Sequence, residues 1–443
     1  MEVLIIASQL ILSLAILVVL HEFGHFIPAK LFKIKVEKFY LFFDPWFSIF
    51  KRKIGDTEWG IGWLPLGGYV KISGMVDESM DKEQLAKPPQ SWEFRSKPAW
   101  QRLIVMIGGV TVNFVLALFL YAMILFVWGK QYYTVDSAQK YGMAVAYTEL
   151  KEYGLEDGDI PVKVGDQKVE NIAKIFSKIV IDGERKITVN RNGEEKVIEL
   201  PKNFDQIALK NGYSELYSLR MPTVVAKVAK ESNALKGGLK ENDSIISING
   251  VATPYFNDFQ TELKSNKGKS IDLAVIRNNQ LTQLNVKVDS SGVIGFNPYT
   301  YSHFNIPYST EKFGFLESFP AGVNLGVETL GNYVKSMGLI FTKEGAKQVG
   351  GFGSMSKIFA PVWDWRVFWS ATAFLSIVLA FMNILPIPAL DGGHVVFLLY
   401  EIVTGKEAPQ KVLEIAQYIG FFLLIGLMLY ANGNDLFKFI AGK

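Results

Sequence analysis

The stretch VLIIASQLILSLAILVVLHEFGH, residues 3–25, joins an apolar run directly to a pair of histidines. Residues 3–20 carry no charge and are long enough to cross a bilayer as a helix. In a helix, His21 and His25 stand at i and i+4 on one face, so their imidazoles can converge on one metal ion. Glu22 beside them can take a proton from a water activated by that metal. The stretch therefore predicts a metal-binding helix inside a membrane, and the alternative is a polar helix end that reaches the headgroup region.

The overall composition indicates a membrane part and a water-soluble part in one chain. Hydrophobic residues make up 49% of the 443 residues, yet 20% are charged. The net charge of +3 is spread along the chain and gives no sign of a nucleic-acid partner. The sequence contains no cysteine, which excludes disulfides and thiolate ligands. Any metal must therefore be held by His, Asp or Glu.

Four uncharged runs are long enough to span a bilayer, and they lie at residues 3–20, 103–128, 367–390 and 415–434. The first run lacks the basic leader and small-residue cleavage site of a signal peptide, so we expect it to stay attached. Residues 30–102 carry thirteen Lys and Arg residues. The positive-inside rule then places this segment in the cytoplasm and the N-terminus outside.

These runs predict a polytopic α-helical membrane protein with four transmembrane helices and two inserted α+β domains. The boundaries that we expect are 1–27 for the first helix, 28–100 for a cytoplasmic segment, 101–129 for the second helix, 130–215 and 220–290 for the inserted domains, 305–364 for an amphipathic segment, 365–391 for the third helix and 411–434 for the fourth.

The cytoplasmic segment contains a predicted β-hairpin between about residues 36 and 75. Residues 36–50 and 59–72 are rich in aromatic and β-branched side chains and are separated by the polar stretch 51–56. Gly67 and Gly68 close it with a permissive backbone. The hairpin is too apolar to lie freely in water, so we expect a loop that re-enters the membrane beside the helices. The alternative is an amphipathic sheet on the membrane surface.

An internal repeat lies in the soluble region. GLEDGD at residues 154–159 matches GLKEND at 238–243 with an offset of 84, and NRNG at 190–193 matches IRNN at 276–279 with an offset of 86. In the second copy, the Gly-Leu-x-x-x-Asp-x-Ile pattern before an alternating strand resembles PDZ domains. The first copy matches less closely, because Pro161 is expected to interrupt the corresponding strand.

The segment at residues 305–364 has apolar residues at helical spacing, and it also holds a glycine cluster at 350–353. We expect an amphipathic helix packed on the outer membrane surface or against the soluble domains. Nothing in it suggests chemistry, and His303 is interpreted as a surface histidine.

A catalytic zinc site normally has three protein ligands, so the histidine pair needs a partner. The third apolar run ends in NILPIPALDGGH, residues 383–394, and odd-numbered helices end on the same, cytoplasmic face. Asp391 is favoured because an ionisable residue at the end of a span is costly unless it pairs or binds metal. His394 is the competitor, since the intervening glycines let the backbone turn either side chain inward. Pro386 and Pro388 break the helix just before, which argues against a simple polar anchor.

Taken together, these features resemble the site-2 protease family of intramembrane metalloproteases, in particular the bacterial type that has tandem periplasmic PDZ domains and acts on anti-sigma factors. The motifs that carry the resemblance are HEFGH at 21–25, PLGGYVK at 65–71, FRSKPAWQR at 94–102, GVTVN at 109–113 and residues 383–393. The sequence departs from the family where Val110 replaces a proline, and around residues 350–353, where a Gly-Pro-Ile-Gly pattern is usual.

The resemblance implies a role for each matching position. It implies that one zinc ion is held by His21, His25 and Asp391, that Glu22 is the catalytic base, that His394 is only a neighbour, and that the substrate contacts Asn383, Pro386, Gly67 and Gly68.

The resemblance also implies a function, which is hydrolysis of a peptide bond within a transmembrane segment of a membrane protein already trimmed on its external side. Anti-sigma-factor-like proteins in a stress response, or remnant signal peptides, are the expected substrates. We expect a monomer in the bacterial inner membrane, with the active site towards the cytoplasm and the PDZ-like domains in the periplasm. These domains either bind an extended peptide or act as a size filter, and the resemblance favours the filter.

Two other classes of function compete with the protease. A non-catalytic PDZ scaffold with a structural metal site has no need for a carboxylate at Glu22. A metal-ion transporter is less favoured, because the spans carry too few polar residues to line a path.

Overall fold

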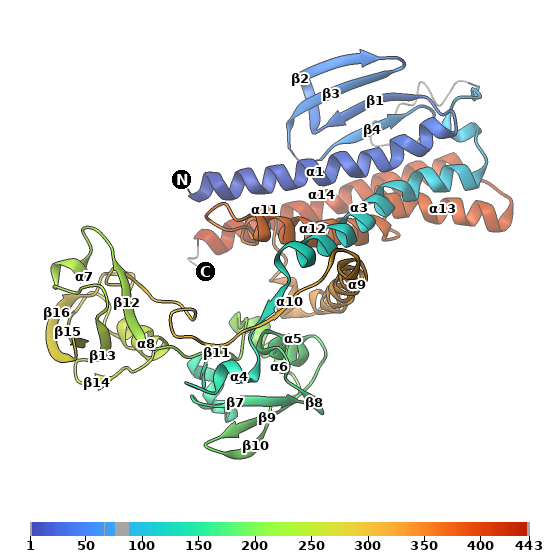
Figure 1. Ribbon diagram of the computed structural model, residues 1–443. Coiled ribbons are helices and arrows are strands. Elements are labelled where there is room, and N and C mark those ends of the chain that lie inside the picture. Colours follow the sequence, from blue (N-terminus) through green and yellow to red (C-terminus); the bar gives the residue numbers. More distant parts are fainter. Residues whose placement is uncertain (1, 66, 76–87, 441–443) are drawn as a thin grey trace. The chain divides into compact units, whose positions relative to one another are not determined.

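The computed structural model describes residues 2–65, 67–75 and 88–440 (Figure 1). The chain divides into two compact units. The helical unit comprises residues 1–129 and 312–443, and the inserted unit comprises residues 130–311. Leu66 of the PLGGYVK motif and residues 76–87 of the cytoplasmic segment lie outside the described residues.

Four helices among the described residues are long and apolar enough to cross a membrane. They are α1 (Glu2–Leu31), α3 (Ala99–Trp128), α12 (Trp365–Ile384) and α14 (Gln410–Ile440). Each of the four predicted spans therefore has a helix, and the chain is a membrane protein with an inserted soluble part. The predicted end of the third helix at residue 391 was wrong, because α12 ends at Ile384, before Pro386 and Pro388. Because α1 continues to Leu31, beyond the predicted end at residue 27, His21 and His25 lie within regular helix.

Helices α1 and α3 cross with their backbones in contact at two glycines. A Cβ atom added to Gly24 would lie 2.4 Å from the carbonyl oxygen of Gly108, and one added to Gly108 would lie 2.0 Å from that of Gly24. Only glycine permits such an approach, and small residues serve this purpose at helix crossings in membranes.

The third spanning helix packs against both members of this pair. Ala373 and Ile377 of α12 form an apolar cluster with Ala117 of α3, and Phe368 packs with Leu17 of α1. The three helices α1, α3 and α12 thus form the core of the helical unit.

The predicted hairpin is part of a larger sheet. Its strands are β1 (Val36–Leu41), β2 (Phe43–Ile54), β3 (Thr57–Leu64) and β4 (Tyr69–Ile72), in the order β2-β3-β1-β4. Strands β2 and β3 form an antiparallel hairpin, but β1 runs parallel to β3 and antiparallel to β4. The prediction of a single hairpin was wrong in this respect, because Phe42, with φ of 69°, ends the first strand and starts a second. Strand β4 lies at an edge of the sheet.

The amphipathic segment contains α9 (Phe315–Ile340), α10 (Lys343–Ala346) and α11 (Phe352–Ser356). Helix α9 packs on α3, a partner that the sequence interpretation did not include, since a Cβ atom on Gly322 would lie 2.5 Å from the backbone nitrogen of Ala122. The glycine cluster docks on α14, where the Asp435 carboxylate accepts hydrogen bonds from the backbone N–H groups of Gly351 and Ser354, both at 2.9 Å.

A helix that the sequence interpretation missed, α13 (Asp391–Thr404), follows the third span where only a connection was expected. The buried Arg102 at the start of α3 ties α13 to α3 through an ion pair with Glu401.

The inserted unit consists of two halves that follow each other along the chain. The first half contains β5 (Lys130–Tyr132), α4 (Val135–Ala138), β6 (Met143–Val145), β7 (Ile160–Val164), β8 (Gln167–Lys168), α5 (Ile175–Val180), β9 (Lys186–Arg191), β10 (Glu194–Glu199), α6 (Phe204–Asn211) and β11 (Tyr217–Leu219). The second contains β12 (Thr223–Val228), α7 (Asn233–Lys236), β13 (Ser244–Ile248), β14 (Val251–Ala252), α8 (Phe256–Ser265), β15 (Ser270–Arg277), β16 (Gln280–Lys287), β17 (Phe296–Pro298) and β18 (Ser309–Glu311).

One ion pair recurs in both halves and accounts for the two repeat offsets. Arg191 of β9 donates to the buried Asp159 at 2.7 Å, and Arg277 of β15 donates to the buried Asp243 at 2.7 Å. Each arginine also bonds the carbonyl of the glycine that opens the repeated loop. The repeated sequence therefore encodes the same buried aspartate–arginine ion pair in each half.

The expectation that Pro161 interrupts its strand was wrong, because β7 includes this residue opposite Val189 of β9. On the other side of β7, strand β8 pairs only with Lys163 and Val164, so no bond to the missing N–H of Pro161 is required there. A register shift between Pro161 and Lys163 accommodates the ring.

We predict that Gly108→Ala destabilises the protein by about 1–3 kcal/mol, because the added methyl group must push α1 and α3 apart. Gly426→Ala in α14 is the matched control, since a Cβ atom there meets nothing within 4 Å. Alanine should be neutral or slightly stabilising at that position. Thermal unfolding in detergent, followed by tryptophan fluorescence, measures both variants. Equal midpoints would contradict the backbone contact.

Candidate metal centre

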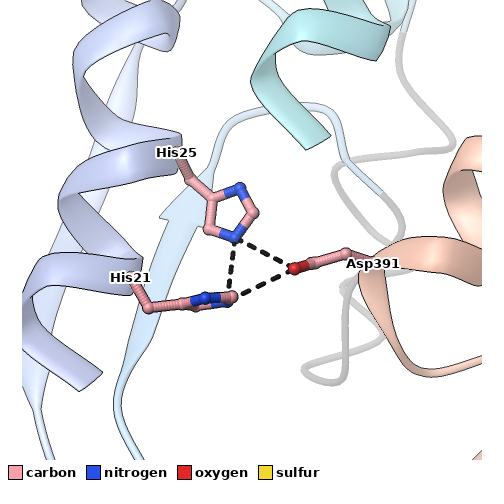
Figure 2. A group of neighbouring side chains, drawn as sticks. All are labelled: His21, His25 and Asp391. Atoms are coloured by element: carbon pink, nitrogen blue, oxygen red, sulfur yellow. Dashed lines mark hydrogen bonds and ion pairs between the residues drawn. The ribbon is translucent and has the colours of Figure 1, made fainter. Parts of the chain in front are cut away.

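Three donor side chains from two helices meet in the helical unit. His21 and His25 project from α1, and Asp391 is the first residue of α13, as Figure 2 shows. The Asp391 Oδ2 atom lies 3.3 Å from His21 Nε2 and 3.4 Å from His25 Nε2. The two Nε2 atoms lie 3.2 Å apart. The structure thus brings together the three residues that the sequence analysis favoured as ligands.

A tight turn after α12 delivers Asp391 to the histidines. The helix ends at Ile384, and Ala389 adopts φ of 74°, a left-handed conformation that is uncommon for alanine. Helix α14 holds this turn in place. Gln417 accepts a hydrogen bond from the backbone N–H of Ala389 at 3.2 Å, and a Cβ atom on Gly420 would lie 1.8 Å from the carbonyl oxygen of Pro388.

The three donors fit one tetrahedral zinc ion. Zinc bonds of about 2.0–2.2 Å at tetrahedral angles place donor atoms about 3.3 Å apart, which matches the separations above. Asp391 Oδ2 is buried and has no hydrogen-bond partner among the described residues. It faces the two imidazole Nε2 atoms at 3.3 and 3.4 Å, so one carboxylate oxygen and two ring nitrogens converge on a single point, an arrangement suited to a cation.

The Nδ1 atom of His25, which is the ring nitrogen that does not face the other two donors, has a hydrogen-bond partner that fixes the orientation of the ring. Its Nδ1–H donates to the backbone carbonyl of Val105 in α3 at 2.8 Å. With the proton on Nδ1, the Nε2 lone pair faces the other two donors, which is the form that binds a metal.

A glycine of α3 passes directly beneath both imidazoles. A Cβ atom on Gly109 would lie 2.4 Å from His25 Nε2 and 2.8 Å from His21 Nε2. Any larger residue would displace the rings, so this position requires glycine. In the sequence, Gly109 is visible only as a member of a motif, and nothing local signals this contact.

A cavity of about 560 Å³ adjoins the three donors. Glu22 lines it beside the histidines, as do three of the four predicted substrate positions, Gly67, Gly68 and Asn383. The fourth, Pro386, is exposed and is not among the lining residues, because the turn directs it away.

Several further residues line the cavity, and the sequence analysis assigned none of them to the metal or the substrate. His394 lines the cavity but lies outside the group of three donors. Gln417 of α14, Asn113 of α3 and Tyr69 of β4 also line it, and none of them was singled out from the sequence as a cavity residue. The whole of β4 contributes to the wall.

Comparison with known proteins identifies relatives along nearly the entire chain. The model of "Peptidase family M50" matches residues 9–427. The "Regulator of sigma E protease" of Haemophilus influenzae is 29% identical, over 97% of this chain and 98% of that protein. A "Putative zinc metalloprotease" of Vibrio cholerae is 29% identical over 96% of this chain and 97% of its own, and one of Xylella fastidiosa is 28% identical over the same shares.

We predict that Asp391→Ala strongly lowers the zinc content of the purified protein, because two histidines alone leave the ion with too few protein ligands. His394→Ala is the matched control, since this neighbour in α13 lies outside the donor group. Metal analysis by mass spectrometry after dialysis gives the number of zinc ions per chain. Loss of zinc in His394→Ala but not in Asp391→Ala would assign the third ligand to His394.

Proposed function

The chain belongs to peptidase family M50, the site-2 protease family, and is a metalloprotease, and from this premise we propose that it is an intramembrane zinc endopeptidase. We propose that it hydrolyses a peptide bond within a transmembrane segment of its substrate. The observation that carries the proposal is the convergence of His21 and His25 of the spanning helix α1 with Asp391 at the start of α13, with Glu22 in the same cavity. A non-catalytic scaffold would not need that carboxylate.

The chemistry divides between the ion and the residues of the chain. When bound, zinc supplies a Lewis acid that polarises the scissile carbonyl and lowers the pKa of water to about 7. Glu22 accepts the proton of the attacking water and delivers it to the leaving amine. His21, His25 and Asp391 hold the ion in place. Glu22 reaches the same reaction centre because it follows His21 directly in α1 and lines the cavity beside it.

The substrate segment must lose its helical hydrogen bonds before cleavage, because a helix protects its own carbonyl groups. Strand β4 is an edge strand, and Gly67–Gly68 and β4 line the cavity. An extended segment that pairs with this edge would regain backbone hydrogen bonds. Asn383, across the cavity, can both donate and accept. Helix-breaking residues in the substrate should therefore favour cleavage.

The glycine pair keeps this strand close to the catalytic helix. A Cβ atom on Gly68 would lie 2.6 Å from Val18 Cγ1 and 3.6 Å from Glu22 Cγ, both in α1. A side chain at this position would push the edge strand away from Glu22. This close approach supports the assignment of Gly68 to substrate positioning, Gly67 is supported only by its place in the cavity wall, and the exposed position of Pro386 supports no such role.

For the membrane topology, we propose that the site faces the cytoplasm and that the inserted unit lies in the periplasm of a bacterial cell, with the protein monomeric in the inner membrane. The basic segment 30–102 after α1 supports this orientation. The name of the Haemophilus relative, a regulator of sigma E protease, supports anti-sigma-factor-like substrates, and remnant signal peptides are a second class.

For the inserted unit, we propose two PDZ-like domains that act as a filter and admit substrates already trimmed outside the membrane. The Asp159–Arg191 and Asp243–Arg277 pairs support two copies of one fold. Peptide binding by strand addition is the second candidate, and the position of β17 at an edge of its sheet favours it.

We predict that Glu22→Gln abolishes cleavage of a model transmembrane substrate and leaves zinc bound, because the amide cannot accept the proton and Glu22 is not among the metal donors. The wild-type protein, in the same detergent and with the same zinc content, is the control. Gel analysis of the substrate, with metal analysis of the same sample, checks both parts. Full activity of the variant would refute the assignment of the base.

We predict that removal of the inserted unit permits cleavage of an untrimmed substrate. Tyr132 and Ser309 are register partners in the antiparallel pair β5–β18, so an Asn-Gly turn can replace residues 133–308. Cleavage of a trimmed substrate by the same variant controls for activity. A variant that cleaves only the trimmed substrate would contradict the filter and favour peptide binding.

A further inference from the structure

The buried asparagine in the middle of α3 faces the outer nitrogen of His21. Asn113 Nδ2 lies 3.2 Å from His21 Nδ1, and Asn113 is 1% exposed. The other amide atom, Oδ1, is buried and has no hydrogen-bond partner in the part of the chain that the structure describes. A buried amide oxygen without a partner costs free energy, so this arrangement needs an explanation.

The chemistry of His21 decides which atom of the amide faces its Nδ1 atom. Its Nε2 atom is the one that faces His25 and Asp391. To bind a metal there, the neutral ring must carry its proton on Nδ1. That Nδ1–H requires an acceptor, and an amide NH₂ group cannot accept. A half turn of the Asn113 amide exchanges its oxygen and nitrogen with almost no change in shape, and it places Oδ1 against Nδ1–H.

We therefore infer that Asn113 is a positioning residue whose side-chain oxygen accepts the Nδ1–H of His21 and so fixes the tautomer that offers Nε2 to the metal. The inference rests on the proposed zinc site and extends it beyond the donors themselves. Asn113 does not touch the ion. It acts through His21, as the backbone carbonyl of Val105 acts through His25.

The placement of these partners along α3 is regular. Val105, Gly109 and Asn113 are spaced four residues apart, so they lie on one face of the helix. Val105 bonds His25, Gly109 passes beneath both rings, and Asn113 reaches His21. One face of α3 thus provides a hydrogen-bond partner for the Nδ1 atom of each histidine. Between these two partners, Gly109 leaves the space that the rings occupy.

The backbone around Asn113 is also anchored. Ser376 of α12 donates from its hydroxyl to the carbonyl oxygen of Asn113 at 2.7 Å, and both residues are buried. A general packing role for buried polar side chains between membrane helices is the competing explanation. Such a role predicts loss of stability on substitution but no selective effect on zinc.

The test compares the zinc affinity of full-length variants in detergent by equilibrium competition with a chelator, which does not depend on catalysis. Asn113→Leu should bind zinc about 10–100-fold more weakly, because a second-shell partner is lost. Asn113→Asp should retain affinity within a few-fold, because a carboxylate accepts the same proton. Asn113→Ala should weaken zinc binding as Asn113→Leu does. It takes the place of Asn113→Leu in the comparison if that variant does not fold.

Thr372→Val is the matched control. It removes a buried hydroxyl 3.0 Å from that of Ser13, between α12 and α1, without touching His21, and should keep wild-type affinity. Two results would overturn the inference, namely unchanged affinity in Asn113→Ala, or a loss in Asn113→Asp as large as in Asn113→Ala. If the proposed zinc site itself is wrong, the result is distinguishable from both of these, because the wild-type protein then binds no zinc.

Discussion

The backbone contact between Gly24 and Gly108 is the constraint on which the rest of the structure depends. Lipid chains are as apolar as leucine, so helices in a membrane gain little from burying large side chains and associate where small residues let their backbones meet. This contact fixes how α1 and α3 cross. It thereby sets Gly109 beneath the imidazoles and brings Val105 and Asn113 to the outer nitrogens of His25 and His21.

The other half of the site depends on a break in regular structure. Asp391 reaches the histidines only because the chain leaves the helix after Ile384 and turns before α13 starts. Non-helical backbone in a membrane protein is tolerated where protein groups or a water-filled cavity satisfy its polar atoms. Gln417 and the close approach of Gly420 meet this requirement from α14, and the Arg102–Glu401 pair secures the far end of α13.

The soluble part follows different rules, and the sequence describes it more directly. In the inserted unit, each half is organised around a buried aspartate held by an arginine from a hairpin. Both residues recur at almost the same offset, so the repeat was visible before the structure. The four-stranded sheet beside α1 was visible only in part. Aromatic and β-branched runs indicated strands, but the break at Phe42 and the parallel pairing of β1 with β3 have no local signal.

The sequence by itself indicated the four spans and the convergence of His21 and His25, and it favoured Asp391 over His394 as their partner from the other end of the chain. Apolar run length, helical period and the parity of crossings are properties of the chain that can be counted along it. Tertiary structure decided the partner of α9, the existence of α13, the continuity of β7 through Pro161 and the exposure of Pro386. It also decided the contacts of Gly109, Asn113 and Gln417, because each contact depends on which backbone or ring lies opposite that residue in space, and the sequence does not specify this neighbour.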